Sequence, residues 1–406
     1  MSPSTPARGP LHGVRVLDLT RVLAGPYATL WLWELGAEII KVEQPGMGDD
    51  TRAFPPMKNG ESVYFASVNR GKKSIALDLK AAADRAIFDR LLLEADVLIE
   101  NFRPGVLDRL GYSWDAVHEK NPSLVYCSVS GFGHSGPYKT LPAYDLVVQA
   151  LSGLMSLNGA EGGPPTRLGI SIGDLGAGLF ATIGICAALT DRANSGQGRR
   201  VDIGMLDCTV ALLENGLVRY LATGEVPEPL GSRHASITPF DAFKAQDDWL
   251  VIGAANDHLF AALCGALDAP GLALDPRYRS VQDRLDNHLD LKAAIEAALS
   301  TASAQDWVAR LVAAGIPAAP INNMPKAAGN PQIAARNMIV SLHDPEMGEL
   351  KVCGNPIKVS GYPDPTDRPA APNLDEHRGD ILRALGEESD DFERTKIPRA
   401  PKHAIW

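Results

Sequence analysis

One carboxylate stands among glycines near the middle of this chain, in surroundings that suit a reaction. Asp174 lies in Ile172-Gly-Asp-Leu-Gly-Ala-Gly178, just ahead of a helix predicted over Leu179–Leu189. The glycines let a ligand approach the backbone, and the start of a helix offers free N–H donors and the positive end of its dipole. Such a place suits an anion or a reacting carbonyl group. Taken alone, an Asp before a helix is more often only its N-cap.

A second candidate nucleophile, Ser171, lies three residues earlier. Gly169-Ile-Ser-Ile-Gly173 matches the G-x-S-x-G pattern of serine hydrolases, and His234 follows for a possible triad. That pattern needs a buried strand before the serine, whereas Glu161–Arg167 is rich in turn residues. A small packing serine is therefore favoured, and hydrolysis through Ser171 stays as an alternative.

A glycine-rich stretch resembles a dinucleotide-binding motif without its context. Gly131-Phe-Gly-His-Ser-Gly136 follows a predicted strand, but Pro137 and Pro142 prevent a helix from starting where the pyrophosphate would need one. We interpret it as a loop. No histidines pair at metal-ligand spacing, and none of the cysteines forms a C-x-x-C pair, so we expect no metal site and reduced, packing cysteines at 127, 186, 208, 264 and 353.

Composition limits the class of protein. A chain of 406 residues exceeds what one hydrophobic core usually serves, and 45% apolar with 22% charged residues is typical of globular enzymes. A net charge of −10 argues against general binding to nucleic acid or anionic membranes. The first ten residues lack an apolar signal region, and we expect Leu175–Leu189 to be too short and too rich in glycine to span a bilayer. These features predict a cytoplasmic location.

Short apolar runs alternate with amphipathic segments up to about residue 130, which predicts an α/β fold with a mostly parallel sheet. The predicted strands are Val14–Leu19, Ala37–Glu43, Ser74–Leu79, Ala95–Phe102 and Leu124–Phe132, and the predicted helices are Pro26–Leu35, Ala81–Leu93 and Pro104–Glu119. The positions that carry chemistry then follow strand ends and helix starts.

The residue pattern of the sequence changes near residue 225, where a linker, a turn-rich loop and a predicted strand at Trp249–Ala254 indicate a second domain. Residues 256–315 are predicted to be helical, and Met338–Val359 alternates like a β-hairpin around Pro345–Gly348, ahead of a short helix near Gly379–Leu385. We therefore predict a large domain over 1–224, a smaller α+β domain over 225–330 and a return to the large domain over 331–406.

Several stretches together resemble the class III CoA-transferases, a family that includes formyl-CoA transferase and the carnitine CoA-transferases. The resemblance covers nearly the whole chain and rests on Leu11–Pro26, Leu35–Glu43, Asn69–Ser74, Glu100–Gly105, Ser130–Gly133, Tyr144-Asp145, the Asp174 motif, Gly196–Asp202 and Leu374–His377, in that order. It implies a Rossmann-like large domain, with its parallel sheet formed from both termini, and a small domain between them. It also implies two chains interlocked as a homodimer, with linkers near 190–229 and 317–330 crossing the partner.

The resemblance implies that Asp174 is the nucleophile and that coenzyme A is a co-substrate, with no permanently bound cofactor. Asp174 would attack the thioester of an acyl-CoA and form an aspartyl-acyl anhydride, gaining from proximity and from backbone donors to the oxyanion. The residues expected to bind CoA are Lys72, Lys73, Asn101, Phe102, Arg103, Arg109 and Tyr144.

The same fold also carries α-methylacyl-CoA racemases, which use the equivalent aspartate with a histidine to move a proton. Those enzymes have Gly-His-Asp where this chain has Ala143-Tyr144-Asp145, and a tyrosine does not readily replace the histidine base at neutral pH. CoA transfer is favoured, and racemisation remains the alternative.

The acceptor is expected to be a dicarboxylic acid. Formyl-CoA transferase has a glutamine where this chain has Leu23, and its glycine loop is replaced by Gly231–Ser236, so formate and oxalate are doubtful. Arg52, Arg233 and His234 are expected to hold the distal carboxylate of glutarate, itaconate, mesaconate or citramalate. The opening segment also resembles succinyl-CoA-dependent transferases, which makes succinyl-CoA the expected donor.

Overall fold

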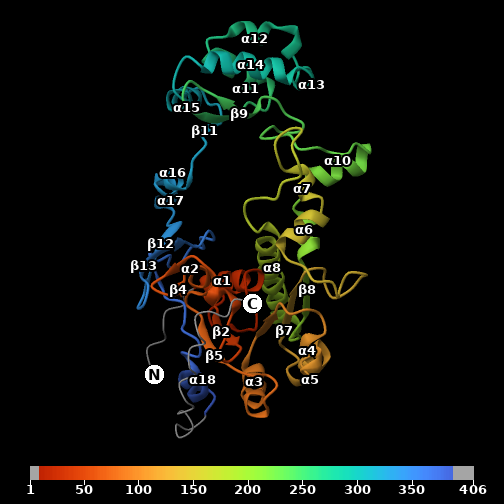
Figure 1. Ribbon diagram of the computed structural model, residues 1–406, viewed down its shortest axis with the longest axis vertical. Coiled ribbons are helices and arrows are strands. Elements are labelled where there is room, and N and C mark those ends of the chain that lie inside the picture. The colour runs from red at the N-terminus through yellow and green to blue at the C-terminus, as the bar shows by residue number, and fades with distance from the viewer. Residues whose placement is uncertain (1–8, 387–406) are drawn as a thin grey trace. The chain divides into compact units, whose positions relative to one another are not determined.

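The computed structural model describes residues 9–386, which fall into two compact units (Figure 1). The described residues of the first unit are those up to Leu154, Arg167–Ala222 and those from Pro331 onward. The second unit takes Met155–Thr166 and Thr223–Asn330. The chain therefore enters the second unit twice, the first time for a short excursion only.

A six-stranded sheet in the order β5-β2-β1-β6-β7-β8 carries the first unit, and all neighbouring strands are parallel. This confirms the predicted α/β class. The strands are short runs, most of them apolar and buried, as expected for a parallel sheet covered on both faces: β1 (Arg15–Asp18), β2 (Glu38–Glu43), β5 (Lys73–Ala76), β6 (Val97–Glu100), β7 (Val125–Ser130) and β8 (Arg200–Gly204).

The prediction that both termini build this sheet is wrong. The strands after residue 330 form a separate three-stranded sheet in the order β13-β12-β14, made of β12 (Ile339–Asp344), β13 (Gly348–Cys353) and β14 (Asp367–Pro369). β12 and β13 are antiparallel, which confirms the predicted hairpin, and Gly348 adopts the positive φ of 71° that the turn requires. The C-terminal helix α18 (Arg378–Ala384) still contributes Ile381 to the core below the large sheet.

Helices cover both faces of the six-stranded sheet. On one face, α1 (Ala24–Glu34) and α8 (Ile172–Ser195) share a core with Val16, Val97 and Cys127. On the other face, α3 (Ala82–Glu94) contributes Phe88 to a core shared with α18. Strand–helix alternation in the sequence thus produces the layers that it predicts.

The helix α8 (Ile172–Ser195) is longer than the sequence predicted. It runs for 24 residues, and by length and composition alone it is apolar enough to cross a membrane, so the prediction that this stretch is too short is wrong. Within the first unit, its Ala177, Ala181 and Ile185 are fully buried against α1 and the sheet. A core helix of this kind passes the same test.

Glycine allows α1 and α8 to approach closely. A Cβ atom at Gly178 would lie 2.7 Å from the carbonyl oxygen of Ala24 and 3.0 Å from the ring of Tyr27. Gly178 therefore fixes the distance between the start of α1 and the first turns of α8.

The remaining elements of the first unit are short. The predicted helix Pro104–Glu119 is two helices, because Gly111 takes a φ of 89° between α4 and α5. These elements are η1 (Asp50–Ala53), β3 (Met57–Lys58), β4 (Glu61–Ser62), α2 (Val63–Asn69), α4 (Val106–Arg109), α5 (Trp114–Lys120), α6 (Asp145–Leu151), α7 (Leu154–Leu157), which runs into the second unit, α9 (Met205–Ala211), α10 (Asn215–Thr223), whose last residue belongs to the second unit, and α17 (Pro331–Ala335).

The second unit packs helices against a three-stranded antiparallel sheet in the order β11-β10-β9. Its core includes Phe243, Leu250, Leu291 and Trp307, all nearly inaccessible to solvent. The elements are β9 (Phe240–Lys244), β10 (Trp249–Gly253), α11 (Asp257–Ala266), α12 (Pro270–Leu274), η2 (Pro276–Tyr278), α13 (Val281–Asp286), α14 (His288–Leu299), α15 (Ala304–Ala313), β11 (Ala318–Pro320) and α16 (Met324–Ala328).

The packing at Gly178 predicts the effect of one methyl group. We expect Gly178→Ala to lower the free energy of unfolding by about 1–3 kcal/mol, because its Cβ must displace the backbone of Ala24. Gly265 is the matched control, since it also lies in a helix but nothing lies within 4 Å of an added Cβ. Gly265→Ala should raise stability by about 0.5–1 kcal/mol. Urea unfolding of both variants measures the difference, and equal effects would contradict the packing argument.

Candidate active site

Asp174 lies inside the first turn of α8 rather than ahead of the helix. The helix begins at Ile172 with Ser171 as N-cap, and the Ser171 side chain makes no capping hydrogen bond. The expected start at Leu179 is therefore wrong by seven residues, because glycines that read as a loop continue the helix. Asp174 is not an N-cap, and its partly buried carboxyl projects from a rigid helical turn.

A neighbouring carboxylate, Asp145, takes over the capping role. It lies at the start of α6, and its Oδ1 accepts a hydrogen bond of 2.9 Å from the backbone N–H of Gly173. Its Oδ2 accepts a hydrogen bond of 2.8 Å from Gln149 Nε2 and lies 3.5 Å from Arg167 Nη2. Sequence reasoning placed Asp145 in a motif but gave it no role of its own.

Gln149 extends this contact to the segment before α8. Its Oε1 accepts from the backbone N–H of Leu168 at 2.9 Å, and its Nε2 also donates to the carbonyl of Ile170 at 3.3 Å. We name Asp145, Gln149 and their bonds to residues 167–173 the α6–α8 clasp. It fixes the first turn of α8 to α6 within the first unit.

The Asp174 carboxyl has an unusually high pKa. Burial raises its pKa from 3.8 to about 7, and the nearby charge of Asp145 adds to the effect. Among residues 9–386, no cation forms an ion pair with Asp174, and none donates a hydrogen bond to it. A carboxylate held in this way is only weakly solvated, which makes it a better nucleophile than an exposed one.

Tyr64 completes this neighbourhood and had no signal in the sequence. It lies on α2, half-buried, and its pKa is raised by burial and then by the charges of Asp174, Asp49 and Asp145. A phenol that keeps its proton close to a carboxylate is a hydrogen-bond donor. Its helix was not predicted, because the segment is short and follows a loop.

The predicted CoA-binding turn follows β6 at the point where the sheet order reverses. Chain order runs from β1 outward to β2 on one side and to β6 on the other, so the ends of β1 and β6 flank a topological switch point. Open α/β sheets bind ligands there. Phe102 is half-buried and packs against the core below the sheet, whereas Arg103 and Arg109 are exposed.

Asn101 is already engaged within this turn. Its Oδ1 accepts from the backbone N–H of Arg21 at 2.9 Å, and its Nδ2 donates to the Arg21 carbonyl at 2.7 Å. Helix α4 after the turn has only four residues, so the expected helix dipole toward a phosphate is weak.

Lys72 is not available to a phosphate, and its predicted contact with CoA is revised. Its side chain is fully buried, and Nζ donates to Asp18 Oδ2, Thr29 Oγ1, the Pro26 carbonyl and Asn69 Oδ1 at 2.7–3.2 Å. Lys73 is 42% exposed and pairs with Glu38 at 2.6 Å. The polar residues that flank the two adjacent lysines gave no sign that one of them points inward.

Arg52 is likewise committed to a structural pair, so its predicted role toward substrate is revised. Its guanidinium forms two bonds of 2.7 and 2.8 Å with Glu43 and lies 3.8 Å from the centre of the Phe65 ring. A bidentate pair of this kind leaves little of the guanidinium for another carboxylate.

Arg233 and His234 belong to the second unit. His234 Nδ1 accepts from the backbone N–H of Ser236 at 3.0 Å. Three buried polar atoms without hydrogen-bond partners in the described chain, on Arg233, Thr238 and His288, line a cavity of about 10 Å³. That volume is close to what one water molecule needs. No ion pair within the described chain engages the Arg233 guanidinium.

The other motifs resolve as follows. Tyr144 is 79% exposed and stands directly before α6. No strand lies between the end of α7 at Leu157 and Ser171, so the strand-to-helix turn of a serine hydrolase is missing there. No helix starts between Gly136 and α6, which confirms that residues 131–136 form a loop. Cys127, Cys208 and Cys264 are buried, but Cys353 is exposed, unlike the packing role expected.

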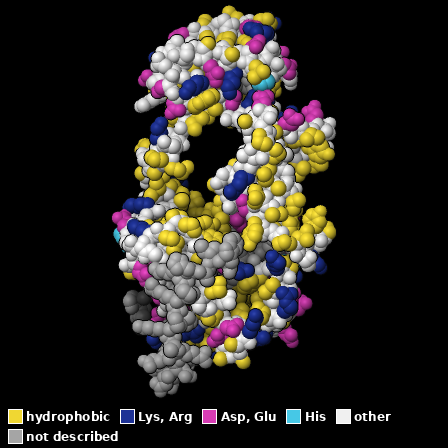
Figure 2. Space-filling view, viewed as in Figure 1, with side chains coloured by type: hydrophobic (Ala, Val, Ile, Leu, Met, Phe, Trp, Pro, Cys, Tyr) yellow, Lys and Arg dark blue, Asp and Glu magenta, His cyan; other side chains and the backbone are white. Residues whose placement is uncertain are grey.

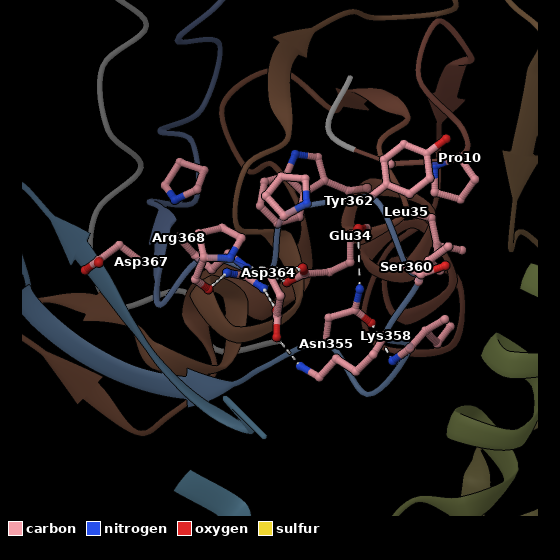
Figure 3. A pocket seen from close by; sticks show the side chains of 17 residues that line it. Pro10, Glu34, Leu35, Asn355, Lys358, Ser360, Tyr362, Asp364, Asp367 and Arg368 are labelled. Atoms are coloured by element: carbon pink, nitrogen blue, oxygen red, sulfur yellow. Dashed lines mark hydrogen bonds and ion pairs between the residues drawn. The ribbon is translucent and has the colours of Figure 1, made fainter. Parts of the chain in front are cut away.

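A well-formed cavity lies elsewhere in the first unit. It has a volume of about 440 Å³ and is lined by Glu34, Tyr362 and Arg368, among others, and by none of the predicted site residues (Figure 3). Its buried charges are already paired, since Glu34 bonds Arg368 at 3.1 Å and Lys358 pairs with Asp364 (Figure 3). This pairing sets it apart from Asp174, with which no cation of residues 9–386 forms an ion pair.

The high pKa of Asp174 predicts a gain in stability on removing its charge. The folded pKa of about 7 exceeds the ordinary value of 3.8, so the folded state bears a cost above pH 7 that vanishes below pH 4. We expect Asp174→Asn to raise the free energy of unfolding at pH 8 by up to about 4 kcal/mol, with no gain at pH 4. Thermal unfolding at several pH values measures this.

Asp115→Asn is the control, because Asp115 is an exposed carboxylate in the first turn of another helix, α5. Its loss should slightly lower stability at pH 8, since it removes a charge that favours the helix dipole. An Asp174 variant that behaves like the Asp115 variant would contradict the burial argument.

Known proteins match this sequence over nearly the full chain. Residues 11–378 match CoA-transferase family III. The chain is 49% identical over 386 residues to the acetyl-CoA:oxalate CoA-transferase of Acetobacter aceti, covering 94% of this chain and 98% of the relative. It is 39% identical to the succinyl-CoA:glutarate CoA-transferase of Mus musculus, covering 93% and 86%.

A solved structure agrees with these sequence matches. The crystal structure of a CAIB/BAIF family protein from Brucella suis superposes with a TM-score of 0.82 at 36% identity, covering 93% of this chain and all of that one. The fold is thus that of a CAIB/BAIF family protein, and the sequence relatives are named as CoA-transferases, enzymes that use CoA as a co-substrate. The chain is an enzyme that belongs to CoA-transferase family III.

Proposed function

We propose that this enzyme moves CoA from an acyl-CoA to a dicarboxylic acid, with Asp174 as the nucleophile. The observation that carries the proposal is the Asp174 carboxyl itself, partly buried in the first turn of α8 and without a cation beside it in the described chain. Such a group is disfavoured as a free carboxylate and gains from becoming a neutral anhydride or thioester.

The proposed reaction proceeds through covalent intermediates of two kinds on Asp174, an anhydride and a thioester. Its carboxylate attacks the donor thioester, the C–S bond breaks, and CoA leaves as a thiolate while an aspartyl-acyl anhydride forms. The thiolate then attacks the aspartyl carbonyl, which releases the donor acid and leaves an aspartyl-CoA thioester. The acceptor carboxylate reverses these steps and leaves as the new acyl-CoA. The Tyr64 hydroxyl is a candidate donor to the oxyanion formed in each attack.

We place CoA along the ends of β1 and β6, with Arg103 and Arg109 toward its phosphates. Both are exposed, and neither pairs with an acid in the described chain. Lys73, Phe102 and Tyr144 remain candidates for further contacts with the cofactor. Lys72 is not among them, because its ammonium is buried in bonds to four oxygens.

For the acceptor, we withdraw the doubt about oxalate. That doubt rested on Leu23 and on the altered loop at Gly231–Ser236, but the relative at 49% identity is named for oxalate. Other relatives are named for glutarate and, in Haloarcula hispanica, mesaconate at 38% identity. Oxalate, glutarate and mesaconate are the acceptors to test, with succinyl-CoA and acetyl-CoA as donors. Arg233 and His234 remain the candidates to hold the distal carboxylate.

We also propose that the enzyme works as a homodimer. Three helices of the first unit carry large apolar side chains that are exposed to solvent, and apolar groups are visible on the surface in Figure 2. Among them are Leu151 of α6, Ile183 of α8 and Leu221 of α10, with exposed fractions of 54%, 62% and 71%. Large apolar side chains this exposed on neighbouring parts of one unit's helices are a reason to expect a subunit interface there. Light scattering should give twice the chain mass, and Ile183→Glu should shift it toward one chain. A wild-type enzyme with the mass of one chain would contradict this.

The anhydride predicts that an oxygen atom moves from the acceptor to the enzyme. With ¹⁸O-labelled oxalate or glutarate as acceptor, each full transfer should leave one ¹⁸O on the Asp174 carboxyl, because the thiolate attacks the acyl carbon. Peptide mass spectrometry after a single turnover measures the 2 Da gain. Transfer without label on Asp174 would exclude the anhydride. Asp174→Asn should lower kcat on the order of 10⁴-fold or more.

The charge of Asp145 predicts a shift in the pH profile. Because Asp174 attacks as a carboxylate, kcat/KM should fall as pH drops below about 7. Asp145→Asn keeps the acceptor for Gly173 but removes the like charge, so the acid limb should move to lower pH. Rates from pH 5 to 9 test this. An acid limb that stays in place in the variant would show that Asp145 does not act on Asp174 through its charge.

A further inference from the structure

Val22 holds a backbone conformation that its side chain disfavours. It follows β1 and has a φ of 67°. Six non-glycine residues in the described part of the chain have positive φ, and Val22 is the one that is β-branched. A β-branched residue in this region is a genuine outlier, and such strain persists only where surrounding contacts impose it.

The contacts that impose it come from four side chains around residues 20–22. Asp49 Oδ1 accepts from the Val22 N–H at 3.1 Å, and Asn101 bonds both backbone groups of Arg21. Asp18 Oδ1 accepts from the Thr20 N–H at 2.9 Å, while Lys41 Nζ donates to the Thr20 carbonyl at 2.7 Å. Asp18, Lys41 and Asp49 are nearly or fully buried, so these bonds anchor the loop to groups in the protein interior.

The strained loop lies directly before the part of α1 that faces the first turns of α8. Helix α1 begins at Ala24, whose carbonyl lies 2.7 Å from the Cβ position of Gly178. Gly178 follows Asp174 by four residues, so both lie on one face of α8. The conformation of Val22 therefore sets where the start of α1 stands along the face that carries Asp174.

We propose that Asn101 is a positioning residue for acyl transfer. Its two bonds to Arg21 hold the strained loop that continues through Val22, and so align the start of α1 with Asp174. This rests on the proposed role of Asp174 as nucleophile. It replaces the expectation that Asn101 is a CoA ligand, since both ends of its amide already bond the backbone of Arg21. Asn101 stands at the switch point of the sheet, where it joins the ends of β6 and β1.

The test uses a loss and a rescue. Asn101→Ala removes both bonds, so Val22 should relax toward negative φ, and we expect kcat to fall about 10- to 100-fold with KM for the acyl-CoA unchanged. Glycine adopts positive φ without cost. Adding Val22→Gly to Asn101→Ala should therefore restore most of the lost kcat, whereas Val22→Gly alone should keep kcat and raise Tm. Initial thiol release in single turnover measures the step concerned.

Asn121→Ala is the matched control. Asn121 is buried, and its Nδ2 donates to the carbonyls of Leu92 and Ala95 at 3.0 and 3.1 Å, far along the chain from the loop. Its loss should lower Tm and leave kcat unchanged. If Asn101→Ala does not fold, Asn101→Asp serves instead, because it keeps the acceptor for Arg21 and removes the donor.

Three results would overturn the inference: a rise in KM alone, which would make Asn101 a CoA ligand; kinetics that match those of the Asn121 variant; or no rescue by Val22→Gly. Its failure is separable from failure of the proposed function. An active Asp174→Asn enzyme would remove the proposed function, whereas an inactive Asp174→Asn enzyme with a fully active Asn101→Ala enzyme would remove this inference alone.

Discussion

Buried ion pairs at the ends of β1 and β2 are the constraint on which the rest of the first unit depends. Lys72 pairs with Asp18 at 3.1 Å, Lys41 with Asp49 at 2.8 Å and Arg52 with Glu43 at 2.7 Å. Buried charges cost free energy unless every one is paired and hydrogen-bonded, and breaking one pair leaves the other charge exposed to that cost. The pairs therefore hold the loops after both strands in one arrangement, including the strained turn before α1.

Two carboxylates of this unit show how surroundings assign different work to the same chemical group. Burial by itself would raise the pKa of Asp18, but the charges of Lys72 and Lys41 outweigh it and lower that pKa to about 2. Asp174 is also shielded from water, yet the charge that acts on it is that of another carboxylate, Asp145, and its pKa rises to about 7. Asp18 is fixed as an anion that organises backbone, whereas Asp174 is left reactive.

The sequence predicted what depends on local pattern and missed what depends on tertiary contacts. Five strands, the hairpin at β12 and β13 and the short helix α18 follow from periodicity and turn residues, and Asp174 stood out from its glycines. The same glycines concealed the true start of α8, because their role is to admit α1 and α6 rather than to form a loop. Neither the inward turn of Lys72 nor the pairing of Arg52 with Glu43 has a local signature. The charge of Asp145 acts on Asp174, and the charge of Asp174 acts on Tyr64, only because the fold brings three separate helices together.

The α6–α8 clasp has a consequence for how this chain tolerates change. Residues 155–166 leave the first unit just after α6 and return just before α8, and Gln149 bonds residues 168 and 170 across the base of that excursion. Because these bonds join the two ends of the excursion, we expect changes in its length and composition to leave the position of Asp174 unchanged. This excursion is the place where sequence could be inserted, exchanged or labelled while the reacting carboxylate keeps its surroundings.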